Sequence, residues 1–215
     1  MGLIVEMVFP KSCVGCGKVG KYLCDKCGEK VEIIGADYKN KRIEGRIGLF
    51  KYHGIIKDLI KLIKFDLVSD AKTEIGELIT RQLKENYPNI LEYWIDKKFV
   101  IIPVPLYWRR ENWRGFNQAQ IIANEVGKIL NLSINNNLIK RFKNTKKQAI
   151  SNKIDRQENL KGAFEIVCEM KKKKLIPKNI IIFDDVWTTG NTVKNIIKII
   201  PKNRKIWVLT LATGN

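Results

Sequence analysis

The amino-acid sequence predicts an α/β protein, in which helices flank a mainly parallel sheet, with a small four-cysteine finger in front of it. Two continuous apolar runs, Phe99–Val104 and Ile180–Phe183, are typical of central strands that are covered on both faces. Apolar residues at helical spacing follow each run, and four cysteines lie in two close pairs near the N-terminus. We therefore expect a finger over residues 1–40 and one α/β domain over residues 41–215.

The composition fits a basic protein with one sizeable core. The chain has 215 residues, 45% of them hydrophobic, and no apolar run reaches the length that crosses a bilayer. The N-terminal stretch MGLIVEMVF has no basic leader, so we expect a cytoplasmic protein without membrane insertion. The net charge of +18 attracts polyphosphates or nucleic acid, although a lysine-rich solvated surface explains it equally well.

Two Cys-x2-Cys-Gly motifs form the strongest metal-binding signal in the sequence. Their cysteines are Cys13, Cys16, Cys24 and Cys27. Each pair places two thiolates on a tight turn, and four thiolates complete a closed tetrahedral site, which indicates structural zinc. Disulfides and a rubredoxin-like iron centre are the alternatives, but nothing marks the chain as secreted. Cys168 stands alone in an apolar context and is expected to be a small core residue.

A strand and two helices are predicted before the first buried run. Gly45–Tyr52 suits a short strand or hairpin. Apolar residues then recur at helical spacing over Ile55–Ile63 and over Ile75–Leu83, and Ser69 or Asp70 can cap the second helix. We expect both helices to present an apolar face to the core.

An arginine-rich segment follows the first buried run. Pro-x-Pro cannot continue a strand ladder, so the chain must turn there, at the sheet edge where the second buried run also ends. Three arginines surround this turn, and their planar, permanently charged guanidinium groups suit a pyrophosphate. The predicted pyrophosphate site comprises Val104, Pro105, Arg109, Arg110 and Arg114.

The aromatic residues of the same segment allow two other interpretations. Tyr107, Trp108, Trp113 and Phe116 can join the arginines in a base-stacking platform for single-stranded nucleic acid. Alternatively, the tryptophans cover the core and the arginines form a solvated rim. In each case Asn117 can cap the helix that follows.

Much of the excess positive charge lies in residues 140–178, which hold thirteen Lys and Arg against four Asp and Glu. Asn144–Asn159 has little apolar periodicity and is expected to be a mobile loop that closes over a polyanion. Lys171–Lys174 is expected to form a solvated turn before the second buried run. Lys205–Ala212 supplies the last strand.

The second buried run ends at two carboxylates, Asp184 and Asp185, which suit the vicinal hydroxyls of a ribose. The turn that follows leads into a helix, and its glycine and the helix N-terminus favour a phosphate. This turn comprises Thr188, Thr189, Gly190, Asn191 and Thr192. Because no lysine follows the glycine, it is not an ATP-type loop. A ribose 5-phosphate is the implied ligand, and the alternative is a plain helix cap behind an acidic turn.

The stretch Ile180–Val193 resembles the phosphoribosyl-pyrophosphate (PRPP) motif of the type I phosphoribosyltransferases. This resemblance implies that Asp184 and Asp185 bind the ribose, that the 188–192 turn binds the 5-phosphate, and that Mg²⁺ binds with PRPP. Purine-salvage members carry a further acidic residue two positions before the motif glycine, where this chain has Thr188. A purine-salvage reaction is therefore disfavoured.

The order of motifs along the whole chain resembles the ComF family. These motifs are the finger, Lys64–Phe65, PVPLYWRRENWRGFNQA, the spacing from Gln148 to Phe164, and DDVWTTGNT. ComF-like proteins have a phosphoribosyltransferase-like fold with an N-terminal zinc finger, and they are associated with DNA uptake in naturally competent bacteria. Asp66 stands where a glycine-bearing turn usually follows the lysine–aromatic pair, so the sequence assigns Lys64 no ligand role.

Two functions of different classes follow from this resemblance. The first is phosphoribosyl transfer from PRPP to an unidentified acceptor, by positioning and by stabilisation of an oxocarbenium-like ribosyl centre. The second is a non-catalytic competence factor that handles single-stranded DNA, or contacts proteins of the uptake machinery, with PRPP as a regulatory ligand.

Overall fold

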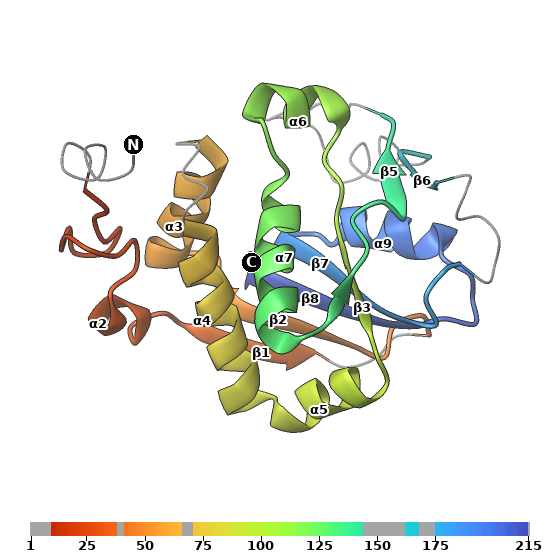
Figure 1. Ribbon diagram of the computed structural model, residues 1–215, viewed down its shortest axis with the longest axis horizontal. Helices are drawn as coiled ribbons and strands as arrows, with labels where there is room; N and C mark the ends of the chain where they lie inside the picture. The colour runs from red at the N-terminus through yellow and green to blue at the C-terminus, as the bar shows by residue number, and fades with distance from the viewer. Residues whose placement is uncertain (1–9, 38–40, 66–70, 144–161, 168–174, 215) are drawn as a thin grey trace.

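The computed structural model describes residues 10–37, 41–65, 71–143, 162–167 and 175–214 (Figure 1). The helices are α2 Asp25–Gly28, α3 Gly54–Phe65, α4 Ala71–Asn86, α5 Pro88–Asp96, α6 Trp108–Arg114, α7 Gln118–Leu130 and α9 Asn191–Ile199. The strands are β1 Ile33–Asp37, β2 Gly45–Lys51, β3 Val100–Pro103, β4 Ser133–Ile134, β5 Ile139–Arg141, β6 Phe164–Ile166, β7 Asn179–Trp187 and β8 Lys205–Thr213.

Six strands form the main sheet, in the order β1-β2-β8-β7-β3-β4. The neighbours from β2 to β4 are parallel, and β1 pairs antiparallel with β2. The two buried runs of the sequence, β3 and β7, are adjacent and lie inside the sheet. The predicted α/β class with a mainly parallel sheet is therefore confirmed.

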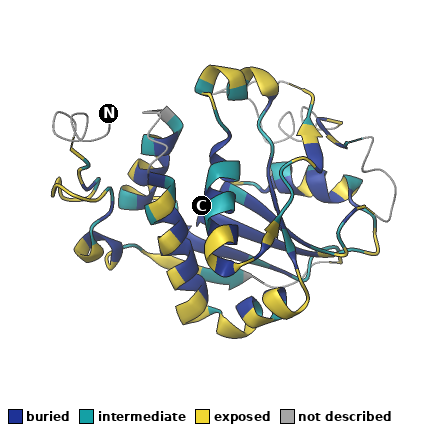
Figure 2. Cartoon of the chain, in the orientation of Figure 1, coloured by how far each residue is buried: buried dark blue, intermediate teal, exposed yellow. Residues whose placement is uncertain are grey.

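Helices cover both faces of this sheet. Along β7, Ile181 and Phe183 belong to the buried cluster that includes α3, α4 and α7, whereas Ile180 and Ile182 belong to the cluster that includes α9, β5 and β6. Successive side chains of a strand point to opposite faces, so this alternation follows from the strand geometry. Figure 2 shows the buried strands between the two outer layers. Covering on both faces explains why β7 begins as an unbroken apolar run.

The finger packs directly against the α/β domain. Cys13, Leu23 and Cys27 belong to the same buried cluster as α3, α4 and α7. The backbone N–H of Leu23 also donates a hydrogen bond to Oε2 of Glu74 on α4, over 2.9 Å. β1 lies before residue 40 as well, yet it is a strand of the main sheet. The boundary near residue 40 stays a prediction, but the residues before it share a core and a sheet with those after it.

Two sequence expectations near the candidate site are wrong. β7 does not end at Asp184 and Asp185, because its parallel ladder with β8 continues as far as the pair of Trp187 and Thr213. The three arginines do not surround the turn after β3, since they lie on helix α6, Trp108–Arg114. The first correction concerns a boundary, which local sequence defines poorly when tertiary pairing extends an element.

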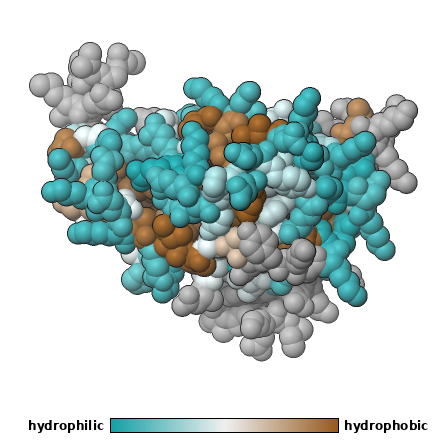
Figure 3. Space-filling view, turned by 90° about the horizontal axis from the view of Figure 1, so that it is seen from below, coloured by the Kyte–Doolittle hydropathy of each residue, from teal (hydrophilic) through white to brown (hydrophobic). Residues whose placement is uncertain are grey.

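Several other expectations lie outside the described residues. These are the caps at Ser69 or Asp70, the loop over 144–159, the turn over 171–174 and the core position of Cys168. No helix in the described part of the chain combines the length and the apolar character that a membrane span requires. The face seen from below in Figure 3 is mostly hydrophilic, with smaller hydrophobic patches between the polar side chains.

Candidate functional site

Asp184 and Asp185 lie at the carboxyl end of β7, beside the end of β3. The backbone N–H of Val104 donates to the carbonyl oxygen of Phe183 over 2.8 Å, so the chain that leaves β3 starts beside these carboxylates, while β7 continues along β8. Asp185 is only 6% exposed, and Asp184 is half-buried. The two carboxylates and the start of the arginine-rich segment therefore lie at one edge of the sheet, where open α/β folds bind ligands.

Asp185 has partners from two different helices. Its carboxylate forms an ion pair with the ammonium group of Lys64, at the end of α3. The amide nitrogen of Gln118, at the start of α7, donates to Oδ2 over 3.2 Å. Burial opposes ionisation, but Lys64 and Gln118 hold the pKa of Asp185 below its ordinary value. Asp185 is thus a carboxylate that stays ionised inside the protein.

Asp184 has the opposite electrostatic character. Burial and the neighbouring charge of Asp185 raise the pKa of Asp184 well above its ordinary value. The backbone N–H of Asp185 donates to Oδ1 of Asp184 over 2.9 Å. Arg141 on β5 lies within electrostatic range of Asp184. Neighbouring carboxyl groups whose pKa values move apart in this way are common at binding and catalytic sites.

The start of α7 connects the arginine-rich segment to Asp185. The side chain of Asn117 caps α7 and donates to the carbonyl oxygen of Val104 over 3.0 Å, which confirms the predicted cap and fixes the end of β3. Arg114 donates to Oε1 of Gln118, and Gln118 in turn donates to Asp185. One arginine of the predicted pyrophosphate site is therefore separated from Asp185 by a single side chain.

The other two arginines of that segment lie on α6. Arg109 is exposed, and its guanidinium group lies 5.2 Å from the ring centre of Trp108. Tyr107, which precedes α6, forms a parallel bridge with Arg141. Burial and the nearby charge of Arg110 lower the pKa of Arg141. Arg110 and Arg141 therefore lie close together, and Arg141 also lies near Asp184. Two neighbouring guanidinium groups favour an anion with more than one negative charge.

The predicted 5-phosphate turn connects β7 to α9, which begins at Asn191. Thr188 is exposed, and Gly190 has a left-handed φ of 69°. A Cβ on Gly190 would lie 2.1 Å from Cζ2 of Trp187. The sequence explains this glycine by the close approach of an anion, whereas in the structure the packing of the indole ring also requires it.

The structure brings three residues to this site that the sequence does not assign to it, namely Lys64, Gln118 and Arg141. Lys64 had a signal in the lysine–aromatic pair, and Gln118 directly follows the predicted cap. Arg141 had no local signal, because it is one of thirteen basic residues over 140–178. These three residues come together only in the folded structure, so their spacing along the chain does not predict that they are neighbours.

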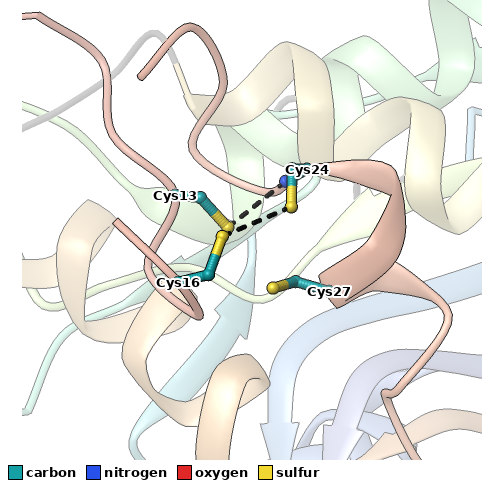
Figure 4. A group of neighbouring side chains, drawn as sticks. All are labelled: Cys13, Cys16, Cys24 and Cys27. Atoms are coloured by element: carbon teal, nitrogen blue, oxygen red, sulfur yellow. Dashed lines mark hydrogen bonds between the residues drawn. The ribbon is translucent and has the colours of Figure 1, made fainter. Parts of the chain in front are cut away.

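The four cysteines of the finger form a second candidate site, with their side chains gathered around one point (Figure 4). Their sulfur atoms all lie within 4.8 Å of one another, and those of Cys16 and Cys24 are 3.6 Å apart. A tetrahedral zinc ion with Zn–S bonds of about 2.3 Å needs sulfur atoms about 3.8 Å apart. All four residues are free thiols rather than disulfides. The cluster therefore fits a closed metal site.

The thiols of this cluster differ in their tendency to ionise. Burial opposes ionisation of Cys13, but hydrogen bonds from the backbone of Cys24, Gly15 and Cys16 lower its pKa to about 6. Burial and the neighbouring thiols raise the pKa of Cys27 to about 12. Four thiolates thus need a cation among them, and that charge is what a bound metal ion supplies.

Comparison with known proteins gives long alignments with bacterial relatives, although no family model matches the chain. The chain is 32% identical to competence protein F of Haemophilus influenzae over 202 residues, which are 88% of this chain and 78% of that protein. It is 27% identical to competence protein ComFC of Bacillus subtilis over 201 residues, which are 85% of this chain and 75% of that protein. It is 32% identical to the DNA utilization protein YhgH of Escherichia coli O157:H7 over 114 residues, which are 51% of this chain and 48% of that protein.

Proposed function

Because this chain belongs to the ComF family of competence proteins, we propose that it binds PRPP and transfers its phosphoribosyl group to an acceptor in the course of DNA uptake. The names of the relatives refer to competence and to the use of DNA, which supports a role in DNA uptake. The chemical part of the proposal rests on the site at the carboxyl end of β7.

One observation carries the proposal: Asp184 and Asp185 lie in the last part of β7, shortly before the turn into α9 and beside the end of β3. In the proposed complex their carboxyl groups accept hydrogen bonds from the two ribose hydroxyls, and the 188–192 turn receives the 5-phosphate. The start of a helix and its free N–H groups suit this phosphate.

The pyrophosphate group would lie toward the segment from Val104 to Arg114. Arg114 is joined to Asp185 through Gln118, and Arg110 lies near Arg141. These guanidinium groups would stabilise the charge that develops on the leaving pyrophosphate. The Lys64 ammonium, already beside Asp185, would keep that carboxylate ionised while it binds the sugar.

Magnesium would enter the site with PRPP. It would neutralise part of the pyrophosphate charge, and substrate oxygens and water would supply most of its ligands. The protein itself would contribute positioning and charge stabilisation around the ribosyl centre. In the finger, Cys13, Cys16, Cys24 and Cys27 would hold a zinc ion with a structural role.

Calorimetric titration of PRPP with Mg²⁺ tests the proposal. Wild-type protein should bind PRPP, and Asp184→Asn or Asp185→Asn should each weaken binding roughly tenfold or more, since a charge-assisted hydrogen bond contributes about 1.5–3 kcal/mol. Lys84→Ala, an exposed change on α4, serves as the control and should bind like the wild type. Wild-type protein that does not bind PRPP would contradict the proposal.

A second candidate function is the handling of single-stranded DNA, and the aromatic residues of α6 favour it. Trp108 is 52% exposed and Trp113 is 76% exposed, although large aromatic side chains are usually buried. Exposed rings next to arginines suit stacking on unpaired bases. Replacing both tryptophans by alanine should then weaken the binding of an oligonucleotide, and unchanged binding would remove α6 as the stacking surface.

A further inference from the structure

Two adjoining open cavities, whose linings include neither Asp184 nor Asp185, carry a dense positive charge. The first, of about 810 Å³, lies where β2 and β8 begin, and its cationic lining residues are Lys41, Arg42, Lys202, Arg204 and Lys205. The second, of about 510 Å³, follows α9 and is also lined by Lys41 and Arg42, to which it adds Lys194 and Lys198. The two shared residues join the cavities into one surface.

This surface has little negative charge, and the carboxylate that supplies it already has partners within the protein. Glu44 is the one acid among the described residues that line the two cavities. Its carboxylate accepts hydrogen bonds from Tyr93 over 3.1 Å and from the indole N–H of Trp207 over 3.2 Å, and it lies 3.5 Å from the ammonium nitrogen of Lys205. Seven cations therefore face solvent or the cavities with one compensating carboxylate.

Not every cation on this surface is available to a ligand in the same way. Arg42 donates to the carbonyl oxygens of Ile197 and Ile200 over 3.2 and 2.8 Å, so it caps the end of α9. Lys41, Lys198 and Lys202, in contrast, are exposed side chains. We therefore assign the ligand contacts chiefly to these three lysines, which we call the cavity lysines.

The charges are distributed over both cavities, from α9 to the start of β8. Lys194 and Lys198 are separated by one helical turn, about 6 Å along the axis of α9, and the remaining cations continue from its C-terminal end to the start of β8. A small phosphate ester would meet only one part of this surface. A ligand with a repeating charge would meet all of it.

We propose that the cavity lysines and their neighbours bind a linear chain of phosphate groups, such as a single nucleic-acid strand or inorganic polyphosphate. The second cavity reaches Asn191 of the 188–192 turn, and Lys194 donates to the carbonyl oxygen of Thr189 over 3.1 Å. Lys41, Lys198 and Lys202 lie outside that turn and outside the carboxylate pair, so the proposal does not depend on PRPP binding. The binding surface is also separate from α6, so it does not need the tryptophans. Binding would be dominated by the release of counterions from the phosphates and would weaken steeply with salt.

A matched pair of triple variants tests this proposal. The first is Lys41→Glu, Lys198→Glu and Lys202→Glu. The control is Lys57→Glu, Lys84→Glu and Lys128→Glu, three exposed lysines on α3, α4 and α7, which cover the other face of the sheet. Both triples change the net charge equally, so any difference between them reports the location of the site. Thermal melts followed by circular dichroism confirm that each variant is folded.

The measurement is fluorescence anisotropy of a labelled oligothymidylate over a range of salt concentrations, with inorganic polyphosphate as competitor. The triple variant of the cavity lysines should bind at least tenfold more weakly, and its log–log salt slope should fall by about 2, at about 0.7 for each phosphate that the protein no longer neutralises. The control triple should be weakened much less, and polyphosphate should displace the oligonucleotide. Equal weakening in both triples, no binding by the wild type, or failure of polyphosphate to compete would each overturn the proposal.

Discussion

Lys64, at the end of α3, forms an ion pair with Asp185, at the carboxyl end of β7. The Lys64 side chain is 17% exposed and that of Asp185 is 9% exposed, so water compensates neither charge fully. This pair ties a helix that the sequence places outside the ligand site to the centre of that site. Removing either partner leaves a largely buried charge, which is more costly than losing a surface ion pair.

Asp185→Asn should therefore destabilise the fold, by on the order of 1–3 kcal/mol, because the Lys64 ammonium loses its counter-charge. Urea unfolding at neutral pH measures this change. The double variant Lys64→Met, Asp185→Asn should recover part of the loss, since it removes both charges. Equal stability of wild type and Asp185→Asn would mean that the ion pair contributes nothing.

Asp184→Asn should have the opposite effect on stability. The pKa of Asp184 is raised on folding, so the folded state binds the proton more tightly than the unfolded chain. The unfolding free energy of the wild type therefore falls as the pH rises from the pKa of Asp184 in the unfolded chain, near 3.9, through its pKa in the folded protein. The amide variant lacks this decline. Its melting temperature should exceed that of the wild type at pH 7 by more than at pH 4, and PRPP binding should weaken in the same protein.

The contrast between these two aspartates is itself a test of the site. A stabilising substitution that lowers ligand affinity is typical of a position kept for function and not for folding. For Asp185, whose pKa is lowered, the stabilising contribution is present above the unfolded pKa and is lost as the pH falls through the folded pKa. Parallel pH profiles for the two variants would contradict this assignment.

Gly190→Ala should be far more disruptive than Thr188→Ala. The new Cβ would meet the ring of Trp187, and the left-handed φ of 69° adds strain. We therefore expect the free energy of unfolding to fall by on the order of 1–3 kcal/mol and the turn to be distorted. Thr188 is exposed, so its change should leave stability unaltered and reduce PRPP affinity only slightly. Thermal melts and calorimetry on both variants check this order. A large loss of PRPP affinity in Thr188→Ala would instead indicate that the Thr188 hydroxyl group contacts the ligand.

Arg141→Ala should weaken the binding of pyrophosphate roughly tenfold, because it removes one guanidinium group from the pair beside Asp184. Lys140→Ala, an exposed change on the same strand, is the control and should have little effect. Titration of pyrophosphate and of ribose 5-phosphate separates the two halves of the ligand. Equal losses for both ligands would show that Arg141 supports the fold of the site in general.

Metal removal should affect more than the finger. Elemental analysis of protein purified without added zinc should find one zinc ion per chain, and iron or no metal would contradict the zinc assignment. Because Cys13 and Cys27 share a buried cluster with α3 and α4, Cys13→Ser should lower the melting temperature of the whole protein and not only loosen the finger.

The elements with a continuous local pattern could be predicted from the sequence. The apolar runs of β3 and β7, the helical spacing of α3 and α4, the Asn117 cap and the cysteine pairs all depend on residues close together in the chain. The partners of Asp185 could not be predicted in this way. Lys64 and Gln118 reach it from elements far away in sequence, and their contacts exist only once the helices pack on the sheet.

The same reason explains the wrong boundaries. β7 continues past its apolar run because β8 offers further backbone partners, which no residue of β7 announces. α6 comes shortly after Pro103 and Pro105, which indicate a turn, and none of its residues is buried. Short helices without an apolar face leave no periodic signal.

The antiparallel pairing of β1 with β2 has a consequence for any shortened form of the protein. β1 supplies hydrogen-bond partners along β2 from Ile33 to Asp37, and it forms the outer margin of the sheet. A version that starts at residue 41 would bare the backbone N–H and C=O groups of β2 as an open edge. Such an edge is a template for strands of other molecules, so the isolated α/β part should self-associate and precipitate, whatever its active-site residues.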